Sequence, residues 1–253
     1  MSERVGFFTD TSVCIGCKAC EVACKEWNGV PEDGLDFTGH SYDNTGALGA
    51  DTWRHVAFIE QERNGSMRWL MSSDVCKHCT SAACLDVCPT GALFRTEFGT
   101  VVVQPDVCNG CGYCVPACPF GVIERREEDG RAFKCTLCYD RLKVGEQPAC
   151  AKACPTESIQ YGELIDLRVR ARERVEELHE AGEESARLYL DDSEDGIGGG
   201  GSIFLLLDEP EVYGLPPDPV STTRDLGGMW RAAAAAGSVV VAGIALAFAG
   251  GRR

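Results

Sequence analysis

The chain has 253 residues, of which 44% are apolar and 25% charged, an ordinary composition for one large or two small globular domains. Asp and Glu outnumber Lys and Arg by 39 to 24, which gives a net charge of -15. Because phosphate backbones are bound by an excess of cations, this charge argues against nucleic acid as a partner. The unusual feature is the content of sixteen cysteines, and their grouping decides the interpretation.

The cysteines form four blocks of four along the chain. Block 1 is CIGCKACEVAC, with Cys14, Cys17, Cys20 and Cys24. Block 2 is CKHCTSAACLDVCP, with Cys76, Cys79, Cys84 and Cys88. Block 3 is CNGCGYCVPACP, with Cys108, Cys111, Cys114 and Cys118. Block 4 comprises CTLC and CAKACP, with Cys135, Cys138, Cys150 and Cys154. Blocks 1 and 3 have the C-x2-C-x2-C-x3-C spacing of bacterial ferredoxins.

Three kinds of cysteine chemistry compete. Disulfide scaffolds belong to short secreted chains, whereas the N-terminus MSERVGFFTD has no export-signal character. Structural zinc also uses C-x2-C pairs, but a third cysteine three residues later is surplus at a tetrahedral ion. A [4Fe-4S] cubane offers separate iron corners to three nearby thiolates and a distant fourth. Proline follows the last cysteine of three blocks, as in ferredoxins, and Lys25 takes that place in block 1. We therefore expect four [4Fe-4S] clusters.

The fourth cysteine of each run in two-cluster ferredoxins binds the other cluster, which ties two blocks into one unit. Blocks 2 and 3 are close in sequence and are expected to pair, so blocks 1 and 4 pair around them. This crossover predicts four ligand sets. Set A is Cys14, Cys17, Cys20 and Cys154; set B is Cys135, Cys138, Cys150 and Cys24; set C is Cys76, Cys79, Cys84 and Cys118; set D is Cys108, Cys111, Cys114 and Cys88. No cysteine remains for catalysis.

The segments between the blocks have hairpin character. Asn64-Gly65, a strong turn signal, lies between two apolar runs at 53–60 and 67–71. Gly99 and Asp129-Gly130 mark two shorter hairpins. The fold class that follows is α+β, with two nested ferredoxin-like dicluster domains, short hairpins and helices. The outer domain takes 1–72 and 127–190, and the inserted domain takes 73–126.

A long helix is predicted after block 4, because Leu164, Leu167, Ala171, Val175 and Leu178 recur at three- and four-residue steps. Gly182 marks its end. The acidic, glycine-rich run 191–201 formally matches G-x-G-x-x-G, but it lacks the flanking strand and helix and is interpreted as a flexible loop. It opens a predicted extended linker, 191–229, within which 203–207 is expected to form a strand.

Residues 232–251 carry no charge, and a span of twenty residues is long enough for a helix to cross a bilayer. We predict a single transmembrane helix at 230–251. Its many alanines and glycines leave open a helix packed in water against another subunit. Arginines flank both ends, so charge does not fix the orientation.

A closely spaced row of one-electron carriers suits electron conduction. The sequence shows no nucleophile motif or dinucleotide fingerprint, and its four histidines have no metal-ligand spacing. They are His40, His55, His78 and His179. Only His78 lies inside a cysteine block, where a hydrogen bond could tune a potential. The sequence thus predicts a non-catalytic electron-transfer subunit that works between a catalytic subunit and a membrane subunit.

Several segments resemble the iron–sulfur beta subunit of membrane-bound respiratory formate dehydrogenase. They include TSVCIGCKACEVACKEWN, CGYCVPACPFG and KCTLCYDRLKVGEQPACAKACPT, together with YDNTGALGADTW, GLPPDP and the C-terminal apolar segment. The resemblance implies a catalytic alpha subunit with a molybdenum or tungsten pterin cofactor, which oxidises formate to carbon dioxide. It also implies a membrane cytochrome b gamma subunit that passes electrons to quinone.

The same resemblance implies a location at the cytoplasmic membrane. The globular part would lie on the outer face, exported in a folded state with the partner, although a cytoplasmic-facing complex fits the sequence as well. The inserted cluster pair would face the membrane. Membrane-bound hydrogenases and thiosulfate, polysulfide or sulfoxide reductases use the same four-cluster architecture, and they remain alternatives for the catalytic partner. A zinc-stabilised interaction module is the non-redox alternative.

Overall fold

A four-stranded sheet supports the cysteine-bearing loops in the computed structural model, which describes residues 4–32, 34, 39, 42–63 and 65–250. The strand order is β8-β1-β10-β9, with β1 and β10 parallel and the outer strands antiparallel to them. The strands are β1 (Val5–Asp10), β8 (Ile159–Glu163), β9 (Arg187–Tyr189) and β10 (Ser202–Leu206). The two central strands are almost wholly buried, because both faces of the sheet are covered.

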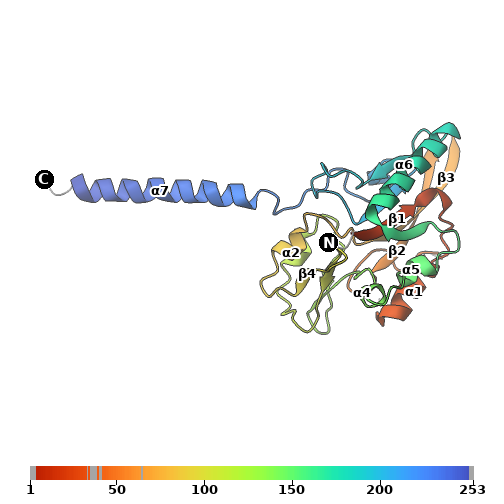
Figure 1. Ribbon diagram of the computed structural model, residues 1–253, viewed down its shortest axis with the longest axis horizontal. Helices are drawn as coiled ribbons and strands as arrows, with labels where there is room; N and C mark the ends of the chain where they lie inside the picture. The colour runs from red at the N-terminus through yellow and green to blue at the C-terminus, as the bar shows by residue number, and fades with distance from the viewer. Residues whose placement is uncertain (1–3, 33, 35–38, 40–41, 64, 251–253) are drawn as a thin grey trace.

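One face of the sheet packs on helix α6 (Leu164–Glu180), where Phe8 and Leu205 contact Leu167 and Ala171 (Figure 1). The other face, with Phe7 among its residues, belongs to the core that contains the cysteines. The predicted helix is confirmed in place. Gly182 follows its last turn in the left-handed conformation (φ 93°), which is typical of a residue that ends a helix.

The pairing of β1 with β8 brings distant parts of the sequence together. β1 leads into block 1 through the short helix η1 (Thr11–Val13), and β8 follows block 4. The backbone amide of Asp10 donates to the carbonyl oxygen of Ser158 at 2.8 Å, and the hydroxyl of Ser158 donates to the carbonyl oxygen of Asp10 at 2.7 Å. The sheet therefore holds the start of block 1 beside the end of block 4.

Short elements surround the cysteines. The helices are α1 (Ala19–Asn28), α2 (Ala83–Asp86), α3 (Cys114–Ala117), α4 (Tyr139–Leu142) and α5 (Ala149–Lys152). The hairpin strands are β2 (Arg54–Arg63) with β3 (Ser66–Val75), β4 (Leu93–Arg95) with β5 (Val101–Val103), and β6 (Glu124–Arg125) with β7 (Ala132–Phe133). All three predicted hairpins are confirmed. Asn64 of the first turn lies outside the described residues, as does His40.

The glycine-rich run is not the loose loop that its composition predicted. Ile197 is fully buried, and the run packs against the loop 77–81 of block 2. Ser81 donates its backbone amide to the carbonyl oxygen of Ile197 at 2.7 Å, and Gly201 donates to that of Lys77 at 2.7 Å. A Cβ on Gly201 would lie 3.0 Å from Cβ of His78, so the absence of side chains permits this close backbone approach. The interval 191–229 also supplies β10, at the centre of the sheet, and the short helix η2 (Pro210–Tyr213).

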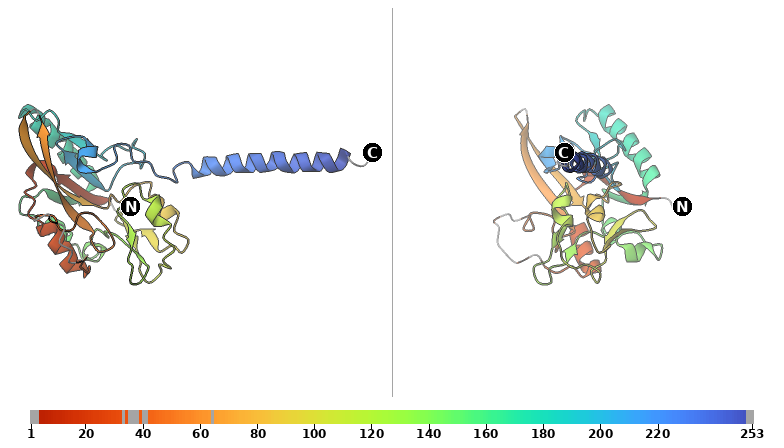
Figure 2. Two further views of the ribbon diagram at one scale, coloured as in Figure 1. Left: turned by 180° about the vertical axis from the view of Figure 1, so that it is seen from behind. Right: turned by 90° about the vertical axis from the view of Figure 1, so that its left-hand side faces the viewer.

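Helix α7 (Leu226–Gly250) projects away from the rest of the protein (Figures 1 and 2). Residues 226–249 have a mean hydropathy of 2.1, and none of that span is buried against the remainder of the protein. The helix is long and apolar enough to cross a membrane. It begins four residues before the predicted span.

Gly6 and Gly162 face each other across β1 and β8 and allow a matched test of the sheet. A Cβ at Gly6 would overlap the carbonyl oxygen of Gly201, whereas the nearest atom to a Cβ at Gly162 is on Leu167, at 3.8 Å. We expect Gly6→Ala to destabilise the protein by about 1–3 kcal/mol, the usual cost of overpacking. Gly162→Ala should have a much smaller effect. Thermal loss of the visible iron–sulfur absorbance measures the difference, and equal effects would contradict it.

Candidate metal centres

The four C-x2-C loops share one backbone feature that the sequence analysis did not anticipate. The residue just before the second cysteine adopts positive φ in every block. These residues are Gly16 (64°), His78 (44°), Gly110 (73°) and Leu137 (57°). Glycine at two of the four positions was a sequence signal for this turn. For His78 and Leu137 the conformation is unfavourable, so the surrounding structure must enforce it. The blocks thus contain four equivalent loops.

The members of set A surround one cavity. Cys14, Cys17, Cys20 and Cys154 line it, together with apolar and hydroxyl side chains that include Val56, Ile159 and Ser73. Burial raises the pKa of Cys14, and the nearby thiolates of Cys154 and Cys17 raise it further. Burial also raises the pKa of Cys20, to about 11. The β1–β8 pairing therefore places the three cysteines of block 1 beside the last cysteine of block 4.

Cys24 faces block 4 instead of its own block. The side-chain amide of Asn28 lies 3.7 Å from Sγ of Cys24 and 3.8 Å from Sγ of Cys138. Burial raises the pKa of Cys24, as do the nearby thiolates of Cys135, Cys150 and Cys138. Cys24 lies on α1 and Cys150 on α5, and these two helices pack together. The four members of set B are therefore neighbours.

Sets C and D are brought together where α2 packs on α3. The pKa of Cys79 is raised by burial and by the thiolates of Cys76, Cys84 and Cys118, which are the other members of set C. In set D, burial raises the pKa of Cys114 to about 11, with contributions from Cys108, Cys111 and Cys88. The thiolates that act on Cys79 and on Cys114 thus belong to the same predicted set as each of them, whereas Cys135 of set B also interacts with Cys76 of set C.

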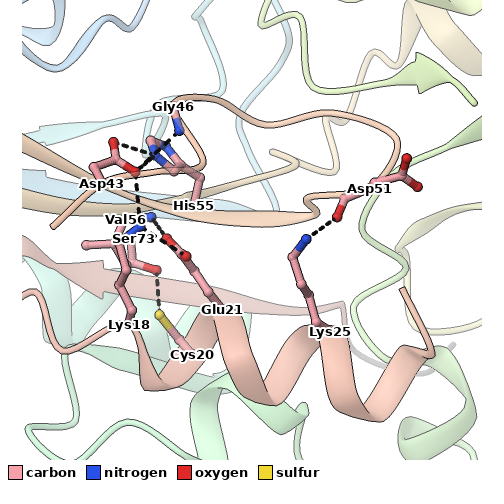
Figure 3. Close-up of polar contacts among 10 residues, drawn as sticks. All are labelled: Lys18, Cys20, Glu21, Lys25, Asp43, Gly46, Asp51, His55, Val56 and Ser73. Atoms are coloured by element: carbon pink, nitrogen blue, oxygen red, sulfur yellow. Dashed lines mark hydrogen bonds and ion pairs between the residues drawn. The ribbon is translucent and has the colours of Figure 1, made fainter. Parts of the chain in front are cut away.

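A network of polar side chains holds α1 against β2 (Figure 3). The buried carboxylate of Glu21 accepts from the backbone amide of Val56. Lys18 bridges Glu21 and Asp43 at 3.2 and 3.0 Å, and Asp43 also contacts Nε2 of His55 at 3.0 Å. This network fixes the helix that carries Cys20 and Cys24.

Lys25 explains why block 1 lacks the proline of the other blocks. It lies inside α1, which continues to Asn28, where a proline would remove a backbone hydrogen bond and strain the helix. Its ammonium donates to the carbonyl oxygen of Asp51 at 2.8 Å (Figure 3). Lys25 thus adds a second connection between α1 and the segment that precedes β2.

The donor set fits [4Fe-4S] clusters. All sixteen cysteines are free thiols. Burial raises the pKa of several of them, Cys24 and Cys79 among them, so a positively charged iron core would compensate by stabilising their thiolates. Among the residues that the structure describes, no three Cys, His, Asp or Glu side chains are arranged to hold a single metal ion. Thiolates that bind separate corners of a cubane need no such convergence. Three buried N–H positions, Nε and Nη2 of Arg54 and Nε2 of His78, have no hydrogen-bond acceptor among the described residues.

Of the remaining histidines, His55 contacts Asp43, and His179 contacts the carbonyl oxygen of Ala186 at 2.8 Å. Both therefore have structural partners. His78 is buried, and its Nδ1 accepts from the backbone amide of Val101 at 3.1 Å. Burial, followed by the charge of Lys134, holds the pKa of His78 well below its usual range, so the ring is neutral with its proton on Nε2.

Comparison with known proteins identifies the family. Two family models, each described as a 4Fe-4S dicluster domain, match residues 13–92 and 67–164. The nitrate-inducible formate dehydrogenase iron–sulfur subunit of Escherichia coli is 41% identical over 98% of this chain and 83% of its own length. The formate dehydrogenase iron–sulfur subunit of Haemophilus influenzae is 44% identical over 83% of this chain and 68% of its own length.

A more distant relative is a component of the anaerobic dimethyl sulfoxide reductase of Escherichia coli, which is 38% identical over 66% of this chain and 78% of its own length. The formate dehydrogenase subunits therefore match over more of the sequence and with higher identity. The sixteen cysteines and both dicluster matches indicate four [4Fe-4S] clusters and a role in electron transfer without a catalytic site. This chain is a member of the family of formate dehydrogenase iron–sulfur subunits.

Proposed function

We propose that this chain conducts electrons within a membrane-bound formate dehydrogenase complex. A catalytic alpha subunit, with a molybdenum or tungsten pterin cofactor, oxidises formate to carbon dioxide and supplies the electrons. A membrane cytochrome b gamma subunit accepts them and reduces quinone. One observation carries the proposal. The same protein combines four groups of closely spaced cysteine thiols with an apolar helix that is not buried against the rest of the protein.

The clusters are held by sets A to D in two nested dicluster units. The outer unit comprises 1–72 and 127–190, and the inserted unit comprises 73–126. Support comes from the pairing of β1 with β8, the packing of α1 on α5, and the packing of α2 on α3. Each bound cluster supplies a one-electron carrier. The clusters of sets A and B lie close together, because Cys20 and Cys24, both on α1, serve different sets.

The outer unit faces the catalytic subunit, and the inserted unit faces the membrane. In Figure 1, α2 and β4 lie on the side from which α7 projects, whereas α1, α4 and α5 lie on the far side. If α7 crosses the bilayer, the inserted unit is the nearer one to the membrane. The globular part lies on the outer face of the cytoplasmic membrane, to which it is exported together with the alpha subunit. A complex that faces the cytoplasm is the alternative orientation.

A second candidate is the same electron-transfer role beside a sulfoxide reductase. The 38% identity to the dimethyl sulfoxide reductase component favours this alternative over other catalytic partners. In this alternative the ligand sets are the same, and the inserted unit still faces the membrane. Only the catalytic subunit and its substrate differ.

Activity of the purified complex distinguishes these candidates. We would tag this protein, solubilise membranes gently, and ask whether the co-purified complex reduces a viologen dye with formate. We expect formate-dependent reduction. The same preparation without formate, and one in which dimethyl sulfoxide oxidises reduced viologen, are the controls. Sulfoxide-dependent oxidation without formate activity would contradict the formate dehydrogenase assignment and favour the second candidate.

A further inference from the structure

Two fully buried cations lie among the cysteines without an acidic partner in the described residues. Arg54 is 2% exposed and Lys134 is 1% exposed. The charged groups that interact most strongly with each of these two cations are cysteine thiolates. Lys77, which is also buried, differs from them because it forms an ion pair with Asp74. An unpaired buried cation is costly, so the structure must compensate for it in another way.

Arg54 lies between set A and set B. Its Nη1 donates to Oγ of Ser73 at 3.0 Å, and that oxygen is 3.3 Å from Sγ of Cys20, a member of set A. The guanidinium also stacks over the ring of Phe7 at 4.8 Å. Its charge interacts with Cys150, Cys135 and Cys24 of set B as well as with Cys20. Nε and Nη2 have no acceptor in the part of the chain that the structure describes, although the residue is buried.

Lys134 occupies the equivalent position between set B and set C. It directly precedes Cys135 of set B, and its ammonium donates to the carbonyl oxygens of Cys135 at 2.9 Å and of Val101. It also interacts electrostatically with the thiolates of Cys76 and Cys84, both in set C. The buried ammonium therefore lies close to cysteines of both sets.

We propose that Arg54 and Lys134 are electrostatic bridges, each of which stabilises the added electron on two neighbouring clusters. An oxidised cubane with four thiolates carries a charge of about -2, and reduction makes it more negative. A fixed cation in a buried site lowers the energy of that extra charge far more than the same cation would in water. One charge shared by two clusters raises both potentials. The clusters of sets A, B and C thus form a stretch of raised potential, with set B favoured by both bridges.

This inference rests on the proposed ligand sets, and it predicts a pattern across the clusters. In the complete complex, Arg54→Gln should lower the midpoint potentials of the set A and set B clusters. Lys134→Met should lower those of sets B and C. Each drop should reach at least tenfold in the reduction equilibrium constant, or about 59 mV for a one-electron couple. The set D cluster should not move in either variant.

A redox titration with a chemical reductant, followed by EPR, measures all four potentials without using formate turnover. Arg54→Lys and Lys134→Arg keep the charge and should restore most of the shift. Arg126→Gln is the matched control, because Arg126 is paired with Asp51 at 2.7 Å and stacks on Phe133, next to Lys134. It should leave every potential unchanged. The iron content shows whether each variant retains its clusters. If Arg54→Gln loses iron, the midpoint potentials of Lys134→Met test the proposal instead.

Three results would overturn the proposal. They are a shift at only one cluster, no shift with the full iron content retained, or equal shifts in the charge-retaining and charge-removing variants. Failure of the proposed function is distinguishable from these results. A complex that does not oxidise formate can still be titrated with a chemical reductant. If the ligand sets were wrong, each variant would still shift two midpoint potentials, but they would belong to other clusters.

Discussion

Replacing Cys24 with serine is expected to remove the cluster of set B and to leave the cluster of set A intact. Cys24 follows Cys20 by only four residues, yet its Sγ shares the amide of Asn28 with Cys138 of block 4. Its thiolate also interacts with Cys135 and Cys150. Serine is a poor ligand for a cubane iron, so about one quarter of the iron should be lost or converted to a three-iron form. EPR of the reduced protein, combined with iron analysis, measures the outcome.

Cys154→Ser is the reciprocal control for that experiment. Cys154 lines the cavity with Cys14, Cys17 and Cys20, although it belongs to block 4. The variant should therefore damage the set A cluster and spare set B. If Cys24→Ser instead eliminated the cluster at Cys14, the crossover between blocks 1 and 4 would be wrong, and so would the nested arrangement of the two units.

Truncation before Leu226 is expected to release the protein from the membrane while it keeps its full iron content. None of the apolar span of α7 is buried against the rest of the protein, so its removal breaks no core packing. Residues 226–249, with a mean hydropathy of 2.1, are the proposed anchor, so the truncated protein should not stay in the membrane. Fractionation of membranes after a high-salt wash, with iron measured in each fraction, tests both parts of the expectation.

The comparison for the truncation is the full-length protein, which should stay in the washed membrane. Two results would contradict the proposed anchor. If the full-length protein were also washed off, α7 would not hold it in the bilayer, and packing of this alanine-rich helix on another subunit in water would be favoured. If the truncated protein lost iron, α7 would contribute to the stability of the globular part, contrary to its exposure along residues 226–249.

The sequence predicted the cysteine blocks, the hairpins and α6 because their signals are local. Ligand spacing, an Asn-Gly turn and a helical apolar period each fall within a few residues. The role of the run 191–201 was missed for the opposite reason. Its glycines indicated flexibility by composition, but they serve to bring the backbone close to the loop 77–81, which is distant in sequence.

The buried cations were also invisible in the sequence. Arginine and lysine are almost never fully buried unless they are paired, so Arg54 and Lys134 were not expected in the core. Only the tertiary structure brings Arg54 near four cysteines from blocks 1 and 4, and Lys134 near Cys76 and Cys84 of block 2. The shared left-handed turn before the second cysteine of each block was visible in part, through Gly16 and Gly110, but not through His78 and Leu137.

Quantitative metal and sulfide analysis of the anaerobically purified protein, together with Mössbauer spectroscopy, tests the central claim most directly. Four [4Fe-4S] clusters predict about sixteen irons and as many acid-labile sulfides per molecule, a brown protein, and Mössbauer spectra of cubane clusters alone. A colourless protein that contains zinc and no labile sulfide would contradict the electron-transfer account and restore the zinc-stabilised module.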